Sequence, residues 1–180
     1  MQNIIAIDIG NTNTKILINS QALQIIANHK LIEDSFTQPL NLPQITGEVK
    51  LGICSVVNSS ISAQIVQKLV QIIAIEKPKI YLLQTHEILA QAIPSQYQDL
   101  KHLGCDRALK IYYLTQLNKF SSSLCFGCGT AFSIEVVVNG KFVDSIITTG
   151  LTLQLNSLNA KITNLPIDTV LSDCFHTSNG

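Results

Sequence analysis

The sequence predicts an α/β protein built from two related lobes, and three observations support this prediction. Apolar runs typical of buried strands alternate with segments of helical periodicity along most of the chain. Hydrophobic residues make up 46% of the 180 residues and charged residues only 13%, as expected for buried sheets. A second set of strands begins near residue 122, so we expect one lobe over residues 1–118 and another over residues 119–180.

The first lobe is expected to begin with a meander of three strands. The apolar runs 3–8, 14–19 and 23–28 are separated only by short polar turns, which favours pairing between neighbours in the chain. A proline-containing loop is expected over residues 33–49. The apolar run 50–57 that follows is long enough to predict a buried strand.

A helix is expected directly after this buried strand. Asn58 and Ser59 offer an N-cap, and residues 60–73 place isoleucine and leucine on one face at helical spacing. Residues 79–84 are again typical of a strand. The order strand, helix, strand predicts a parallel pair covered by the helix. A second helix is expected over residues 105–118.

The second lobe is expected to contain three strands and a helix. The strands are predicted over residues 123–127, 131–138 and 141–147. Asn139 and Gly140 lie between the last two strands and are typical of a tight hairpin turn. A final helix is predicted over residues 151–161.

Charge and cysteine content narrow the class of protein. Lys plus Arg and Asp plus Glu both total 12, so a formal charge of zero gives no electrostatic reason to expect nucleic acid or an acidic membrane. The N-terminus has no signal-peptide pattern, and no apolar stretch approaches the length of a membrane span. Five cysteines, an odd number, favour free thiols. We therefore expect a cytoplasmic protein without nucleic-acid or membrane partners.

A polar segment at the end of the first strand is a candidate phosphate-binding loop. Gly10 permits close approach of the backbone to a ligand, Asp8 could hold Mg²⁺ directly or through water, and Lys15 could neutralise phosphate. A polar hairpin turn is the alternative interpretation, but it explains the acid and the lysine less well. The candidate residues are Asp8, Ile9, Gly10, Asn11, Thr12, Asn13, Thr14 and Lys15.

Two further segments contain residues suited to chemistry. Asp106 and Arg107 begin a predicted helix and could act as general base and anion clamp, although an acid in a first helical turn is also favoured by ordinary electrostatics. The turn that ends in Thr130 could approach a second phosphate, or it could be a plain β-turn. Cys125 and Cys128 form a CxxC without the second pair that a structural zinc would need.

Taken in order, four segments resemble those of type III pantothenate kinases, a family of the actin-like ATPase superfamily. AIDIGNTNTK resembles the first phosphate motif, and GICSVV a strand ending in Ser-Val-Val. YQDLKHLGCDR resembles the pantothenate motif, in which a tyrosine stands seven residues before Gly-x-Asp-Arg. GTAFSIEVVVNGKFV resembles the second phosphate segment, with Ser133 and Glu135 in place of the usual Thr and Asp.

The resemblance implies two ribonuclease-H-like lobes and ATP- and Mg²⁺-dependent phosphorylation of pantothenate to 4'-phosphopantothenate, the first step of coenzyme A biosynthesis, by a homodimer. It implies that Asp106 is the catalytic proton acceptor and that Asp8 through Lys15, together with Thr130, contact ATP. The residues that match pantothenate contacts are Tyr97, Gly104, Cys105, Asp106, Arg107 and Thr177.

The sequence also departs from the family pattern. The family usually has Asp-x-Gly-Thr-Ala, whose Asp holds K⁺ or NH₄⁺, and Gly127 stands at that position, so we expect this cation site to be lost. A Gly-Gly pair is replaced by Asp144 and Ser145, and a Pro-Gly pair by Thr149 and Gly150.

The family's adenosine-site Gly-Gly motif is absent from the sequence, so we also expect an incomplete second lobe. Two alternatives follow. One is a catalytically impaired or truncated relative that binds pantothenate or acts as a regulator. The other is a kinase of the same superfamily that acts on a different small molecule.

Overall fold

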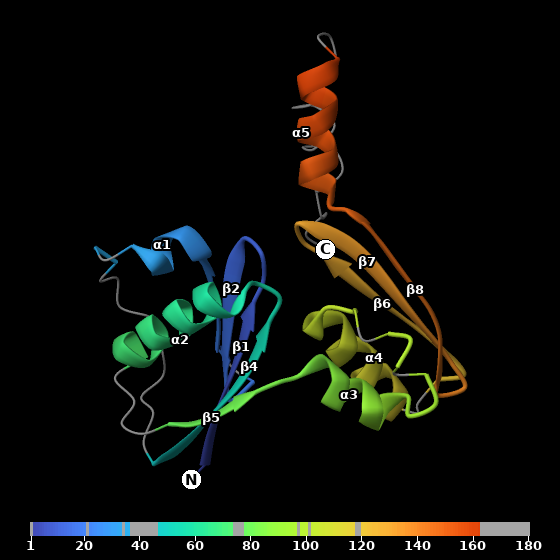
Figure 1. The fold of residues 1–180 in the computed structure, drawn as a ribbon, viewed down its shortest axis with the longest axis horizontal. Helices are drawn as coiled ribbons and strands as arrows, with labels where there is room; N and C mark the ends of the chain where they lie inside the picture. Colours follow the sequence, from blue (N-terminus) through green and yellow to red (C-terminus); the bar gives the residue numbers. More distant parts are fainter. Residues whose placement is uncertain are drawn as a thin grey trace, which may run out of the picture.

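The computed structural model contains two β-sheets with helices packed against both (Figure 1). It describes residues 2–20, 22–33, 35–36, 47–73, 78–96, 98–100, 102–117 and 120–162. Most of the loop expected over residues 33–49 lies outside these ranges, and so do Tyr97 and Thr177.

The first sheet has five strands, in the spatial order β3-β2-β1-β4-β5. The strands are β1 (Gln2–Ile9), β2 (Asn13–Ile18), β3 (Ala22–Ala27), β4 (Glu48–Ser55) and β5 (Lys79–Leu82). The first three form the predicted antiparallel meander. β4 runs parallel to β1 and to β5, so the predicted parallel pair is confirmed. This order brings the ends of β1 and β4 together at one edge of the sheet.

Two helices, α1 (Asn28–Ile32) and α2 (Ser59–Ile73), lie on one face of this sheet (Figure 1). β2 alternates exposed and buried side chains, as a strand with one covered face must. Ile65 and Leu69 of α2 are fully buried against that face. The N-cap predicted for α2 is present, because the Ile61 amide donates to the Asn58 side-chain oxygen at 2.9 Å.

The second sheet is antiparallel, in the order β6-β7-β8. Its strands are β6 (Ser122–Cys128), β7 (Ala131–Val138) and β8 (Lys141–Thr149). Asn139 and Gly140 both have positive φ angles, 50° and 70°, so the predicted tight hairpin is confirmed. Helices α3 (Thr85–Ala92) and α4 (Cys105–Leu117) pack on each other, and α4 packs against this sheet. α5 (Leu151–Lys161) projects from the end of β8 (Figure 1).

Two helices were missed by the sequence analysis. α1 has only five residues, too few for helical periodicity to be recognised, and it begins where the third strand was expected to end. α3 follows β5 after only Leu83 and Gln84. β8 also runs two residues beyond its predicted end, to Thr149. No helix in the described part of the chain is long and apolar enough to cross a membrane. The division into lobes at residue 118 stays a prediction.

Truncation of a buried side chain should lower the free energy of unfolding more than truncation of an exposed one. We expect Leu69→Ala, at a fully buried position, to lower the free energy of unfolding by about 2–5 kcal/mol because a cavity replaces part of the side chain. Leu23→Ala, at a position 59% exposed on the outer strand β3, should change it by less than about 0.5 kcal/mol. Denaturant unfolding followed by circular dichroism measures both. Equal losses would contradict the packing of α2 on this sheet.

Candidate active site

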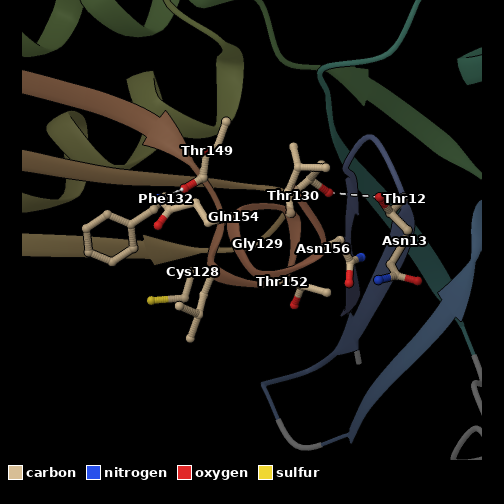
Figure 2. Close-up of a pocket in the computed structure, with 13 residues that line it drawn as sticks. Thr12, Asn13, Cys128, Gly129, Thr130, Phe132, Thr149, Thr152, Gln154 and Asn156 are labelled. Atoms are coloured by element: carbon tan, nitrogen blue, oxygen red, sulfur yellow. Dashed lines mark hydrogen bonds between the residues drawn. The ribbon is translucent and has the colours of Figure 1, made fainter. Parts of the chain in front are cut away.

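The turn between β1 and β2 is tightly closed. The Gly10 amide donates to the Asn13 carbonyl at 3.0 Å, and a Cβ at Gly10 would lie only 3.2 Å from the same oxygen. At the tip of this turn, the hydroxyls of Thr12 and Thr130 share a hydrogen bond of 2.8 Å (Figure 2). Two turns that belong to different sheets and lie 118 residues apart in the sequence therefore meet at one point.

Asn28, the first residue of α1, holds the turn between β1 and β2 by three hydrogen bonds. Its amide nitrogen donates to the Gly10 carbonyl at 2.7 Å, and its side-chain oxygen accepts from the Thr14 hydroxyl at 2.8 Å. Its backbone amide donates to the Thr12 carbonyl at 2.8 Å. Asn28 and Thr14 are both buried, so these bonds are shielded from water. The sequence analysis placed Asn28 at the end of a strand and did not recognise this role.

Asp8 and Lys15 face each other across the β1–β2 pair. They are partners in the register of the two strands, and the Lys15 ammonium lies 3.1 Å from the Asp8 carboxylate. Their side chains are 39% and 52% exposed, so this ion pair is accessible to solvent and contributes little stability. A ligand could therefore separate the two charges at small cost.

A pair of buried thiols, Cys54 and Cys105, lies near the two candidate carboxylates. Cys54, beside Asp8 in the sheet, is hydrogen bonded to Cys105 at the start of α4. This bond raises the pKa of Cys54 and lowers that of Cys105, and burial together with the carboxylates of Asp8 and Asp106 raises the pKa of Cys54 further. Both carboxylates thus act on the same thiol, so Asp8 and Asp106 both lie near Cys54.

Asp106 lies in the first turn of α4 and folds back over Gly104. A Cβ at Gly104 would lie 2.6 Å from an Asp106 carboxylate oxygen, so only glycine fits there without movement of the acid. The Gly104 carbonyl accepts the amides of Arg107 and Ala108 and so begins the helix. Among the described residues, no hydrogen bond or ion pair holds the Asp106 carboxylate, which leaves its oxygens available as proton acceptors.

Arg107, which the sequence suggested as an anion clamp, is paired within the protein. Its guanidinium nitrogen Nε lies 3.0 Å from a carboxylate oxygen of Glu135, whose side chain is fully buried. It also donates to the hydroxyl of Ser145, which is itself 3.5 Å from Glu135. The family pattern has glycine at position 145. The Ser145 hydroxyl fits there because it bonds to Arg107 and Glu135.

Lys110 is the second cation beside Glu135. Its ammonium lies 3.6 Å from the other carboxylate oxygen of Glu135 and donates to the Ser133 hydroxyl at 2.9 Å. A Cβ built at Gly127 would clash with this ammonium and would lie 2.7 Å from the Ser133 hydroxyl oxygen. The space that a side chain at position 127 would fill is therefore occupied. The sequence analysis had not singled out Lys110.

A pocket of about 800 Å³ opens beside the two turns (Figure 2). Gly150 joins β8 to α5 at its edge, and a Cβ there would clash with the Gly129 carbonyl and lie 2.7 Å from that of Thr130. The turn after β6 and the first turn of α5 are thus in backbone contact. Residues lining the pocket include Thr12, Asn13, Cys128, Gly129, Thr130, Phe132, Thr149, Thr152, Gln154 and Asn156.

The structure brings together only part of the predicted site. Thr12, Asn13 and Thr130 line the pocket, while Asp8 and Asp106 both lie near the buried thiol of Cys54. Tyr97 and Thr177 lie outside the described residues. In the part of the chain that the structure describes, no group of three or more His, Cys, Asp or Glu side chains is placed to hold a metal ion.

Strand order, parallel pairing and the meeting of two turns define a mixed α/β protein with two sheets. A crystal structure described as a conserved Baf family transcriptional activator from Campylobacter jejuni shares this fold, with a TM-score of 0.50 and 15% identity. That match covers 87% of this chain and 59% of the other. MreB5 of Spiroplasma citri bound to AMPPNP is more distant, with a TM-score of 0.40 and 7% identity over 89% of this chain and 58% of that one.

Residues 4–178 match the family described as type III pantothenate kinase, and the chain belongs to this family. A curated type III pantothenate kinase from Pelagibacter ubique is 25% identical over 170 residues. The match covers 91% of this chain and 65% of the relative, so the chain spans less than two thirds of that protein's length.

Removal of the Asn28 side chain should loosen the first turn. We expect Asn28→Ala to lower the free energy of unfolding by about 1–3 kcal/mol, because the Gly10 carbonyl and the Thr14 hydroxyl lose a buried partner. Amide hydrogen exchange at Gly10 should become faster. Gln71→Ala, at an exposed position on α2, is the matched control and should leave both quantities unchanged. Unchanged exchange at Gly10 in the Asn28 variant would contradict this role.

Proposed function

We propose that the chain catalyses ATP-dependent phosphorylation of pantothenate to 4'-phosphopantothenate, the first step of coenzyme A biosynthesis. Membership of the kinase family supports this proposal. The observation that carries it is the hydrogen bond between Thr12, in the turn after β1, and Thr130, in the turn after β6. Both residues line the same pocket. Phosphoryl transfer depends mainly on positioning and charge neutralisation, and the two turns bring the Thr12 and Thr130 hydroxyls to one point beside the pocket.

In this proposal, Asp8 through Lys15 and Thr130 bind the phosphates of ATP. The half-exposed Asp8 carboxylate fits Mg²⁺, which prefers oxygen ligands and when bound would neutralise phosphate charge. Lys15 would leave Asp8 and pair with a phosphate oxygen, an exchange that is cheap because the present pair is exposed to solvent.

Asp106 would accept the proton of the attacking hydroxyl of pantothenate. Its carboxylate lies at a helix start and has no competing partner among the described residues, and Asp8 lies near the same buried thiol, that of Cys54. Gly104 and Cys105 hold the helix start in place. Arg107 would contact the substrate either while it keeps its bond to Glu135 or after that bond breaks. Tyr97 and Thr177 are proposed as further pantothenate contacts. We also propose a cytoplasmic homodimer.

The monovalent cation that the family pattern implies does not fit this chain. Gly127 offers no side-chain ligand atom, and the Lys110 ammonium fills the space where a side chain at that position would begin. We therefore assign no K⁺ or NH₄⁺ to this site.

Replacement of Asp106 tests the proposal. The unmodified chain should phosphorylate pantothenate with Mg·ATP, and Asp106→Asn should lower kcat by about 10²–10⁴-fold because the proton acceptor is lost. Binding of Mg·ATP, measured by calorimetry, should persist. Glu87→Gln, at an exposed carboxylate on α3, is the control and should keep full activity.

Three outcomes would contradict this function in different ways. Pantothenate binding without turnover by the unmodified chain would favour a catalytically impaired relative with a binding or regulatory role. Firm ATP binding without pantothenate binding would favour a kinase for another small molecule. Full activity of the Asp106 variant would remove that residue from the mechanism.

A further inference from the structure

The ammonium of Lys110 lies close to the turn between β6 and β7, the candidate second phosphate-binding turn, which contains Thr130. Lys110 lies on α4 one turn after Asp106, and its ammonium sits beside Gly127, at the end of β6. Gly127 immediately precedes Cys128, which lines the pocket. The Lys110 side chain is 22% exposed, so it is largely withdrawn from water but not sealed away from the site.

The ammonium and a side chain at position 127 exclude each other. A Cβ at Gly127 would clash with the Lys110 ammonium and would approach its Cε to 3.3 Å. A carboxylate at this position could therefore not be added without moving Lys110. The absence of a side chain at 127 and the presence of a lysine at 110 are thus two parts of one arrangement.

Two cations and one buried carboxylate surround this arrangement, and a second carboxylate, Asp106, lies one turn earlier on α4. Arg107 and Lys110 both face Glu135, a single fully buried carboxylate. Arg107 makes the closer contact, at 3.0 Å against 3.6 Å for Lys110. Lys110 directs its hydrogen bond to Ser133 on the strand that follows the turn, so its ammonium is the cation beside that turn. A positive charge beside a turn that binds phosphate favours an anionic ligand.

We propose that Lys110 is a built-in substitute for the monovalent cation of the family. Its ammonium supplies, from this chain's own side chain, the charge that K⁺ or NH₄⁺ supplies where position 127 carries a carboxylate. The inference rests on the proposed function. Lysine suits the role because its ammonium is a compact cation with three donors, close in chemistry to NH₄⁺. Because the charge is tethered, nucleotide binding by this chain does not depend on a dissolved monovalent cation.

A comparison of cations tests this inference on the unmodified chain. Mg·ATP binding is measured by calorimetry in K⁺ and in tetramethylammonium, which is too large for the site, at equal ionic strength. The Kd should differ by less than about twofold between the two cations. A Kd at least about tenfold lower in K⁺ would overturn the proposal.

Chemical rescue supplies the second arm. Lys110→Ala keeps Arg107 as partner of Glu135, so the variant retains one ion pair for the buried carboxylate. In tetramethylammonium its Kd for Mg·ATP should rise by about tenfold, and NH₄⁺ or methylammonium should restore most of the loss. Lys141→Ala, at an exposed lysine at the start of β8, should change neither quantity. An unchanged Kd in the Lys110 variant, or a loss without rescue, would overturn the proposal.

Thermal unfolding separates failure of this inference from failure of the proposed function. Without nucleotide, the melting temperature of Lys110→Ala should rise with NH₄⁺ relative to tetramethylammonium, and that of the unmodified chain should not. If Mg·ATP binds in no condition, the proposed function fails, and this comparison still decides the role of Lys110. A flat response in both chains, or a rise in both, would overturn the inference.

Discussion

The buried carboxylate of Glu135 is the constraint on which the arrangement of the site depends. A charge at a fully buried position must be paired, and both partners of Glu135 come from one face of α4. The pairing therefore fixes α4 against β7, and Ser145 extends the same network to β8. Asp106 lies in the first turn of α4. The position of this candidate base is therefore fixed in part by the pairing of Arg107 and Lys110 with Glu135. Loss of Glu135 would leave two cations without their shared counter-charge.

Much of the fold follows from local sequence signals. The apolar runs, the Asn58 cap and the Asn139–Gly140 turn each reflect a short-range rule, and the strands and long helices lie where these rules place them. α1 and α3 were missed for a related reason. A helix of five residues cannot display a period, and α3 follows a strand too closely for a separate start signal.

The candidate site was less predictable, because its contacts join distant parts of the chain. Asp8, Thr130 and Asp106 could be singled out from motif and resemblance. The roles of Asn28 and Lys110 could not, since each depends on a backbone or side chain that only the fold brings near. Arg107 illustrates the same limit from the other direction. Its position at a helix start suggested an anion clamp, which stays a prediction, and only the fold shows that an internal carboxylate is its partner.

Within the described part of the chain, α5 is attached to the second sheet only near its first turn, and this gives the pocket an unusual wall. This helix has eleven residues and no buried side chain among them, yet its first turn lines the pocket beside Thr130. A helix of that length is marginal in water unless it packs against something. The free energy of forming helix α5 therefore contributes to the binding free energy of a ligand in the pocket. A ligand that touches the first turn of α5 also selects its helical state, so recognition and local folding become one equilibrium.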